Sequence, residues 1–61
     1  MRNNIQKDNI EIGEYYKVKD FEYGYRLVKV IEPISDKPGY YWVKYSDGGI
    51  YDFYCSELNK L

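Results

Sequence analysis

Few side chains in this sequence have the types and spacing that catalysis needs. The chain contains no histidine and a single cysteine, Cys55, and it has no nucleophile motif, no glycine-rich phosphate loop and no metal-ligand spacing. Asp47 and Asp52 are close in sequence, but Asp47 fits a turn and Asp52 a solvated strand position. A chain of 61 residues also lacks room for a deep cleft that tunes pKa values. We therefore expect no enzymatic activity, no cofactor and no metal ion.

The chemistry that the sequence favours is recognition by aromatic rings and lysine side chains. Alternate residues of a strand point to the same side of a sheet, and this alternation places a mixed aromatic and lysine set on the outer side. The expected partner-binding residues are Trp42, Tyr40, Tyr15, Tyr54, Lys17, Lys19, Lys29 and Lys44. Tryptophan and tyrosine are typical anchors of protein interfaces. Rings interleaved with lysine also stack nucleic-acid bases while the ammonium groups contact phosphates.

Two other interpretations of the outer aromatic residues stay open at this point. Trp42 can pack against the N-terminal tail or the Pro33–Pro38 loop, and a homodimer can also bury it. The nine Tyr, two Phe and one Trp residues exceed what a small core encloses, because each ring buries about 150–250 Å². Several rings are therefore expected on the surface.

The charge balance bears on the class of partner. Nine basic and ten acidic residues give a net charge of −1, whereas a generic nucleic-acid binder shows a basic excess. The balance favours a protein partner, although it leaves a local basic face open. No segment is apolar for long enough to cross a membrane and no signal-peptide pattern opens the chain, so no membrane partner is expected.

Cysteine usage and composition suggest a compartment and a source. Cys55 cannot form an internal disulfide and fits a small apolar packing position, which is consistent with the cytoplasm. Frequent Ile, Asn, Lys and Tyr residues suggest an AT-rich genome, such as that of a low-GC bacterium or its phage.

The segment from Tyr40 to Leu58 predicts a strand, a tight turn, a second strand and a 3-10 turn at Ser56–Leu58. Asp47-Gly48 or Gly48-Gly49 supplies the positive φ angles of a two-residue hairpin turn. Leu58 is expected to plug the core, and Lys60-Leu61 to pair briefly as a fifth strand. The residues assigned to the core from this hairpin are Val43, Tyr45, Tyr51 and Phe53.

Two further strands are expected before this hairpin, and residues 1–9 are expected to form a flexible tail. The first strand lies within Ile10–Lys19, and Ile12, Tyr16 and Val18 fall on its core side. The second strand, Tyr25–Glu32, is apolar on both faces, which is typical of a strand that is central and bent or covered on its second side. In the Asp20–Gly24 loop, Phe21 or Tyr23 either caps the end of the sheet or faces a ligand.

Four stretches of the sequence resemble a Tudor-like domain of the SH3-like small β-barrel group. They are Ile12–Val18 (IGEYYKV), Tyr25–Glu32 (YRLVKVIE), Trp42–Gly49 (WVKYSDGG) and Ser56–Leu58 (SEL). The resemblance covers residues 11–61. It implies an all-β fold with a single small antiparallel barrel of four to five strands over residues 10–61 and a short 3-10 turn near the C-terminus.

The resemblance also implies a candidate ligand site. Tudor domains often hold a methylated lysine or arginine in a cage of aromatic rings, and the matching positions in this chain are Phe21, Tyr25 and Tyr45. The family commonly has an aromatic residue beside the turn glycine and an asparagine after it. This chain has Ser46 or Asp47 and then Gly49 at those places, so recognition of a methylated ligand ranks third among the functions considered.

The sequence as a whole predicts a non-enzymatic protein-interaction module, either an adaptor or a small inhibitor, that binds through the aromatic and lysine set. One member of that class is a small anti-defence protein encoded by a phage or another mobile element. The alternative function is that of a nucleic-acid-binding SH3-like barrel that uses the same residues. Steep salt dependence of binding distinguishes the nucleic-acid alternative.

Overall fold

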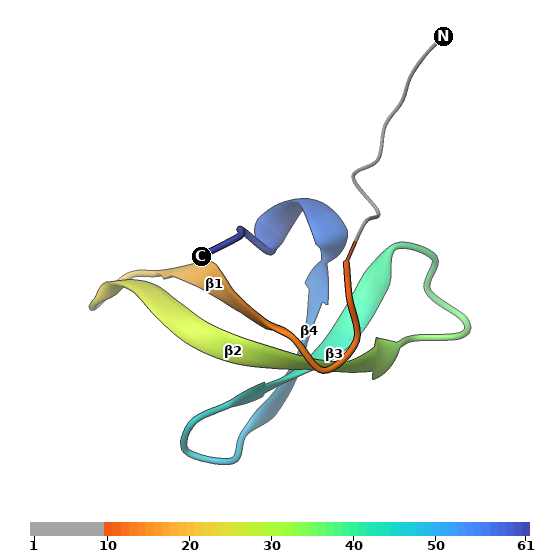
Figure 1. Cartoon of the computed structure of the whole chain (residues 1–61), viewed down its shortest axis with the longest axis horizontal. Helices are drawn as coiled ribbons and strands as arrows, with labels where there is room; N and C mark the ends of the chain where they lie inside the picture. Colours follow the sequence, from red (N-terminus) through yellow and green to blue (C-terminus); the bar gives the residue numbers. More distant parts are fainter. Residues whose placement is uncertain (1–9) are drawn as a thin grey trace, which may run out of the picture.

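The computed structural model describes residues 10–61, so the tail expected at 1–9 lies outside the described residues. The chain forms β1 (Tyr15–Asp20), β2 (Gly24–Pro33), β3 (Tyr40–Tyr45), β4 (Ile50–Tyr54) and the 3-10 helix η1 (Cys55–Glu57). The strands pair in the order β1-β2-β3-β4 as one antiparallel sheet (Figure 1). The predicted all-β class, the four antiparallel strands and the late 3-10 turn are confirmed. The sheet is not closed into a barrel.

The long strand β2 connects the two halves of the sheet. Its first part, Gly24–Lys29, pairs with β1, and its second part, from Val28 to Pro33, pairs with β3. The register shifts between Val30 and Glu32, and such a bulge bends a strand and increases its twist. Figure 1 shows the result: β2 runs through the molecule, and the β1–β2 and β3–β4 hairpins cross. The prediction of a central, bent strand is confirmed.

The core is built mainly from valines at alternate positions of neighbouring strands. Val18, Val28, Val30 and Val43 are fully buried. Tyr16 and Leu58 complete the buried cluster, which confirms that Leu58 plugs the core. Tyr45 and Phe53 are half-buried and pack against this cluster.

Two residues predicted on the core side are exposed instead. Tyr51 is 50% exposed, because the valines fill the centre and its ring lies at the edge of the sheet against Tyr45, with centroids 4.7 Å apart. Ile12 is 51% exposed. It lies in a turn before β1, where Gly13 has a φ of 88°, so the strand alternation has not yet begun.

The β3–β4 turn differs from the expected two-residue turn. Tyr45 N–H donates to the carbonyl of Gly49, and Gly48 N–H donates to the carbonyl of Tyr45. Only Gly48 takes a positive φ, 96°, in this turn. This pattern is a three-residue loop, a type I turn followed by a left-handed residue.

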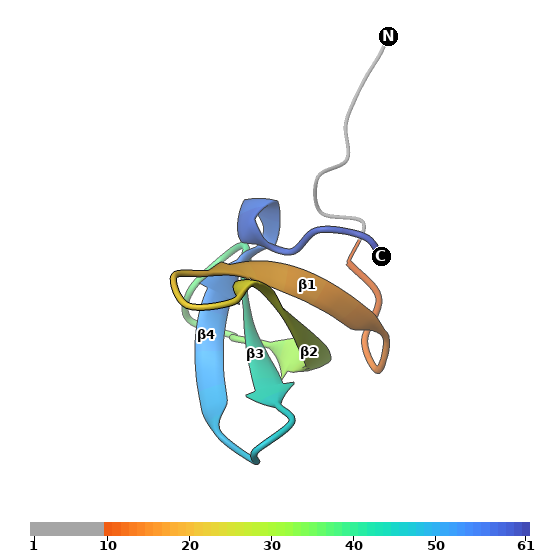
Figure 2. The same cartoon turned by 90° about the vertical axis from the view of Figure 1, so that its left-hand side faces the viewer.

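The C-terminal segment returns to β1 (Figure 2). Lys17 and Asn59 exchange two backbone hydrogen bonds of 2.9 and 3.0 Å. This contact is an isolated bridge at Asn59. The fifth strand that was expected at Lys60-Leu61 is absent from the described residues. The 3-10 helix begins one residue earlier than predicted, at Cys55, which is buried.

The packing of the valines leads to a stability prediction. Val43→Ala removes both γ-methyl groups from a fully buried position, and we expect the free energy of unfolding to fall by about 2 kcal/mol. Urea unfolding measures the loss. Ile50→Ala, at an exposed position of the neighbouring strand, is the control and should cost less than half as much. Equal losses for the two variants would contradict this description of the core.

Candidate interaction surface

The pairing register defines an outer face on the sheet. Lys29 of β2 pairs with Tyr15 of β1 and with Lys44 of β3, and Lys44 pairs with Ile50 of β4. These four residues therefore form one row across the four strands, pointing away from the valine core. We define the outer face as Tyr15, Lys17, Lys19, Tyr25, Leu27, Lys29, Glu32, Tyr40, Trp42, Lys44, Ile50, Asp52 and Tyr54. All eight predicted partner-binding residues belong to it.

The β1–β2 part of the outer face is basic and aromatic. Lys17 lies over the ring of Tyr25, with Nζ 5.0 Å from the centroid, and Lys29 lies over the ring of Tyr15 at 5.9 Å. Such cation–π contacts are modest at exposed sites, about 0.5–1 kcal/mol. Tyr15 and Tyr25 remain 50% and 53% exposed, so half of each ring is open to a partner.

The structure segregates charge in a chain that is slightly acidic as a whole. Where the two strands of the β1–β2 hairpin pair, over residues 15–29, no outward strand position carries a carboxylate. Two other cations form ion pairs: Arg26 Nε lies 3.1 Å from Asp20 Oδ2, and Lys37 Nζ lies 2.7 Å from Asp52 Oδ2. The last ion pair lowers the pKa of Asp52 and raises that of Lys37. The β1–β2 part of the outer face is therefore locally basic despite the net charge, whereas Glu32 and Asp52 lie beside Trp42 in its β3–β4 part.

The β3–β4 part of the outer face is aromatic and partly structural. The rings of Tyr40 and Tyr54 meet edge to face at 5.2 Å, and Lys37 Nζ lies 4.6 Å from the centroid of Tyr40. A Cβ built on Gly39 would lie 2.5 Å from the ring of Tyr54, so this ring packs closely on the loop. Trp42 stays 37% exposed and Tyr54 38% exposed, so a partner can reach both rings.

The predicted aromatic cage is not formed, and that prediction needs correction. Phe21 is 108% exposed, and the surface hollow that it lines with Lys19, Asp20 and Gly24 includes neither Tyr25 nor Tyr45. Tyr25 lies on the outer face under Lys17, whereas Tyr45 points to the core side opposite Val28. The loop residues Phe21 and Tyr23 also do not fold back over the sheet, because Tyr23 is 68% exposed. The three rings belong to a loop tip and to opposite faces of one sheet.

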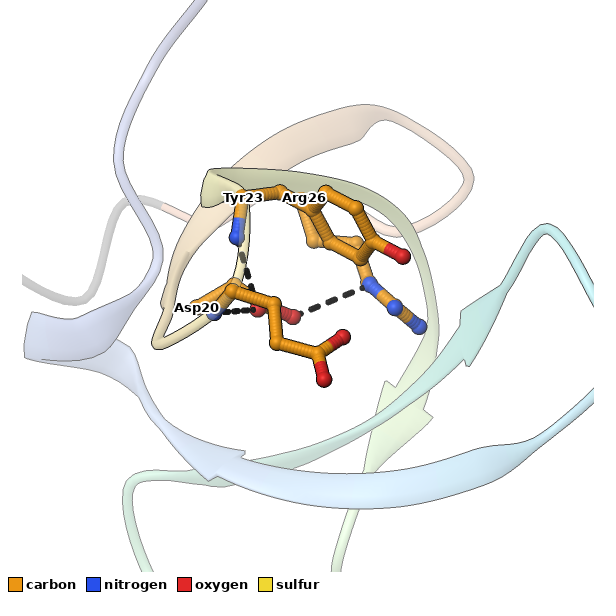
Figure 3. A network of polar contacts seen from close by, with 4 residues as sticks. Asp20, Tyr23 and Arg26 are labelled. Atoms are coloured by element: carbon orange, nitrogen blue, oxygen red, sulfur yellow. Dashed lines mark hydrogen bonds and ion pairs between the residues drawn. The ribbon is translucent and has the colours of Figure 1, made fainter.

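The cation that does stack on Tyr45 is the chain's own Arg26. Its guanidinium lies 4.8 Å from the centroid of Tyr45 and 5.5 Å from that of Tyr23. Asp20 forms an ion pair with this guanidinium (Figure 3). Asp20 Oδ1 accepts hydrogen bonds from the N–H groups of Glu22, at 2.7 Å, and Tyr23, at 3.2 Å. The Glu22 N–H bond, followed by the Tyr23 bond and Arg26, lowers the pKa of Asp20 despite partial desolvation.

The sequence prediction placed Tyr25 in the aromatic cage and left Leu27 out of the outer set. Both lie on the outer face beside Lys17 and Lys19. The signal was present in the alternation, because Tyr25, Leu27 and Lys29 are spaced two residues apart. The ion pair of Lys37 and Asp52 joins residues that are 15 positions apart, so no local sequence pattern predicts it.

Comparisons with known proteins do not assign this chain to a family. No protein-family model, no curated protein and no solved structure matches this chain. Within residues 10–61, His, Cys, Asp and Glu side chains do not gather in groups of three that could hold a metal ion. No helix in this part of the chain is long and apolar enough to span a membrane.

The lowered pKa of Asp20 predicts a pH-dependent contribution to stability. Asp20→Asn keeps an oxygen that accepts the backbone hydrogen bonds but removes the charge. A carboxyl whose pKa is lower in the folded state stabilises the fold above its unfolded pKa, about 3.9, and loses this effect as pH falls through the folded value. We expect the variant to be less stable than wild type at pH 7, with a difference that shrinks below about pH 4.

Urea unfolding at a series of pH values measures this difference. Asp36→Asn, which removes the same charge from the exposed 34–39 loop, is the control and should show a smaller difference at pH 7. A gap between wild type and Asp20→Asn that stays constant from pH 7 to pH 2 would contradict the role given to the Asp20 charge.

Proposed function

We propose that this protein is a non-enzymatic interaction module that binds another protein through the outer face of its sheet. The observation that carries this proposal is the combination of half-exposed rings with lysines that form no ion pair to a described carboxylate. Aromatic side chains are enriched at the centres of protein interfaces, and charged side chains such as those of lysine belong to the polar rim around them. The mechanism is occlusion, in which the bound module covers a surface of its partner, as an adaptor or a small inhibitor does.

A protein partner fits the arrangement better than a catalytic or purely structural role. Trp42 is exposed and lies between Glu32 and Asp52 on neighbouring strands, so it offers a large ring with polar groups around it. This resembles an anchor residue with a polar rim. We further propose an SH3-like, Tudor-like module that acts in the cytoplasm, and a phage or other mobile element as its source. An anti-defence inhibitor is one member of this class.

The proposal predicts that Trp42 is a hot spot. Trp42→Ala should weaken capture of a specific protein from lysate of the source cell by about thirtyfold, since hot-spot truncation costs about 2 kcal/mol or more. Phe21→Ala is the matched control, because it removes a fully exposed ring outside the outer face. Unfolding curves confirm that both variants are folded. Equal capture by wild type and both variants would contradict the role of Trp42.

A nucleic acid is the second candidate partner, and the local basic character of the outer face favours it. Neutralisation of four phosphates of a single strand by Lys17, Lys19, Lys29 and Lys44 gives a slope of about −3 in a plot of log K against log salt concentration. A protein interface centred on aromatic rings responds weakly to salt. Fluorescence anisotropy with labelled oligothymidylate, between about 50 and 200 mM salt, measures this slope, and binding with a slope near −3 would replace the protein proposal.

Recognition of a methylated ligand and self-association rank below these two functions. The guanidinium of Arg26 already stacks on the ring of Tyr45 that the cage would need. A methylated ligand cation would therefore have to displace Arg26 from this ring and from its ion pair with Asp20. A homodimer would bury Trp42 without another partner, and sedimentation of the purified protein over a range of concentrations distinguishes this case.

A further inference from the structure

Two lysines of the outer face lie in an unfavourable position. Lys29 pairs directly with Lys44 across β2 and β3, and both side chains are exposed. Opposed residues of an antiparallel pair have Cβ atoms about 4.5–5.5 Å apart, and like charges there destabilise the sheet. Neither lysine forms an ion pair with a carboxylate of residues 10–61. A bound anion would relieve this repulsion.

The same two lysines line a groove of ≈ 490 Å³. The residues around this groove, which we call the lysine groove, are Tyr15, Leu27, Lys29, Lys44, Tyr45 and Ser46. None of them is acidic. The hydroxyl of Ser46 is a further donor for an anion, and Tyr15 and Leu27 supply apolar walls. The groove therefore combines a pair of cations with apolar surface.

The surroundings of the lysine groove favour a short acidic segment over a nucleic-acid strand. Lys29 and Lys17 already lie over the rings of Tyr15 and Tyr25, so stacked bases would compete with these ammonium groups. Glu14 directly precedes Tyr15, and Asp47 directly follows Ser46. The charge of a nucleic-acid strand continues on both sides of the groove and would be repelled by these carboxylates, whereas a short acidic segment need not extend to them.

We propose that the lysine groove binds the carboxylates of a short acidic segment of the partner protein, between Lys29 and Lys44. This inference rests on the proposed function, because it names the chemistry of the surface that the outer face binds. Aspartate or glutamate side chains accept hydrogen bonds from both ammonium groups, while apolar neighbours in the same segment contact Tyr15 and Leu27. The partner therefore presents acidic and apolar side chains together.

A labelled eight-residue peptide with the repeated sequence Leu-Glu-Glu-Leu, which we call the acidic peptide, is the direct probe, with anisotropy as the readout. Lys29→Gln and Lys44→Gln should each weaken peptide binding about tenfold, because each removes one charge-assisted hydrogen bond. Lys60→Gln, the same change outside the groove, should leave binding unchanged. Lys44→Gln should also raise the urea midpoint, because it removes the like-charge contact with Lys29. A more stable protein that binds less well shows that the loss is not caused by unfolding.

The outcomes separate this inference from the proposed function. Absence of acidic-peptide binding to wild type, or binding by Lys29→Gln and Lys44→Gln as tight as that of wild type, overturns the inference but leaves a partner captured through Trp42 in place. Tighter binding of an eight-nucleotide oligothymidylate than of the acidic peptide, lost in the same two variants, assigns the groove to nucleic acid and also overturns it. Binding of the acidic peptide without a Trp42-dependent partner would contradict the proposed function instead.

Discussion

The double pairing of β2 is the constraint on which the rest of the structure depends. Val28 and Lys29 pair with β1 on one side and with β3 on the other. The inward residue of this pair builds the core, and the outward residue lies between Tyr15 and Lys44. A one-residue slip of either neighbour would exchange the two faces and place lysine in the core. Burial of the valines therefore also fixes the geometry of the outer face.

Charge is distributed so that the β1–β2 part of the outer face keeps its basic character. Asp20, at the end of β1, and Asp47, in the β3–β4 turn, accept backbone hydrogen bonds. The outward carboxylates Glu32 and Asp52 lie beside Trp42. Arg26 and Lys37 each form an ion pair with a carboxylate, whereas Lys29 and Lys44 form none with a carboxylate of the described residues. The repulsion between these two lysines is a small stability cost that the proposed binding role would explain.

The sequence allowed much of the fold to be predicted, because alternation and turn residues are local signals. The two-sided apolar pattern of β2 indicated its central position, and Val43 and Leu58 were assigned to the core correctly. Tyr51 and Ile12 were not, since the core is filled by small valines and Gly13 delays the start of β1. The residues of the outer face could be predicted from the alternation of side chains along each strand. The absence of the cage could not, because it depends on the direction in which the Asp20–Gly24 loop projects, and no local sequence pattern indicates that direction.

The central claim is that the outer face is the binding surface, and amide chemical-shift mapping with the captured partner tests it most directly. The account predicts that the largest shifts upon addition of partner occur at Lys29, Lys44 and Trp42, with small changes at η1 and in the 34–39 loop. If the largest shifts occur at η1 or at the loop tip around Phe21, and the outer face is unchanged, the account is contradicted. The interface then lies at one of those two segments and not on the outer face of the sheet.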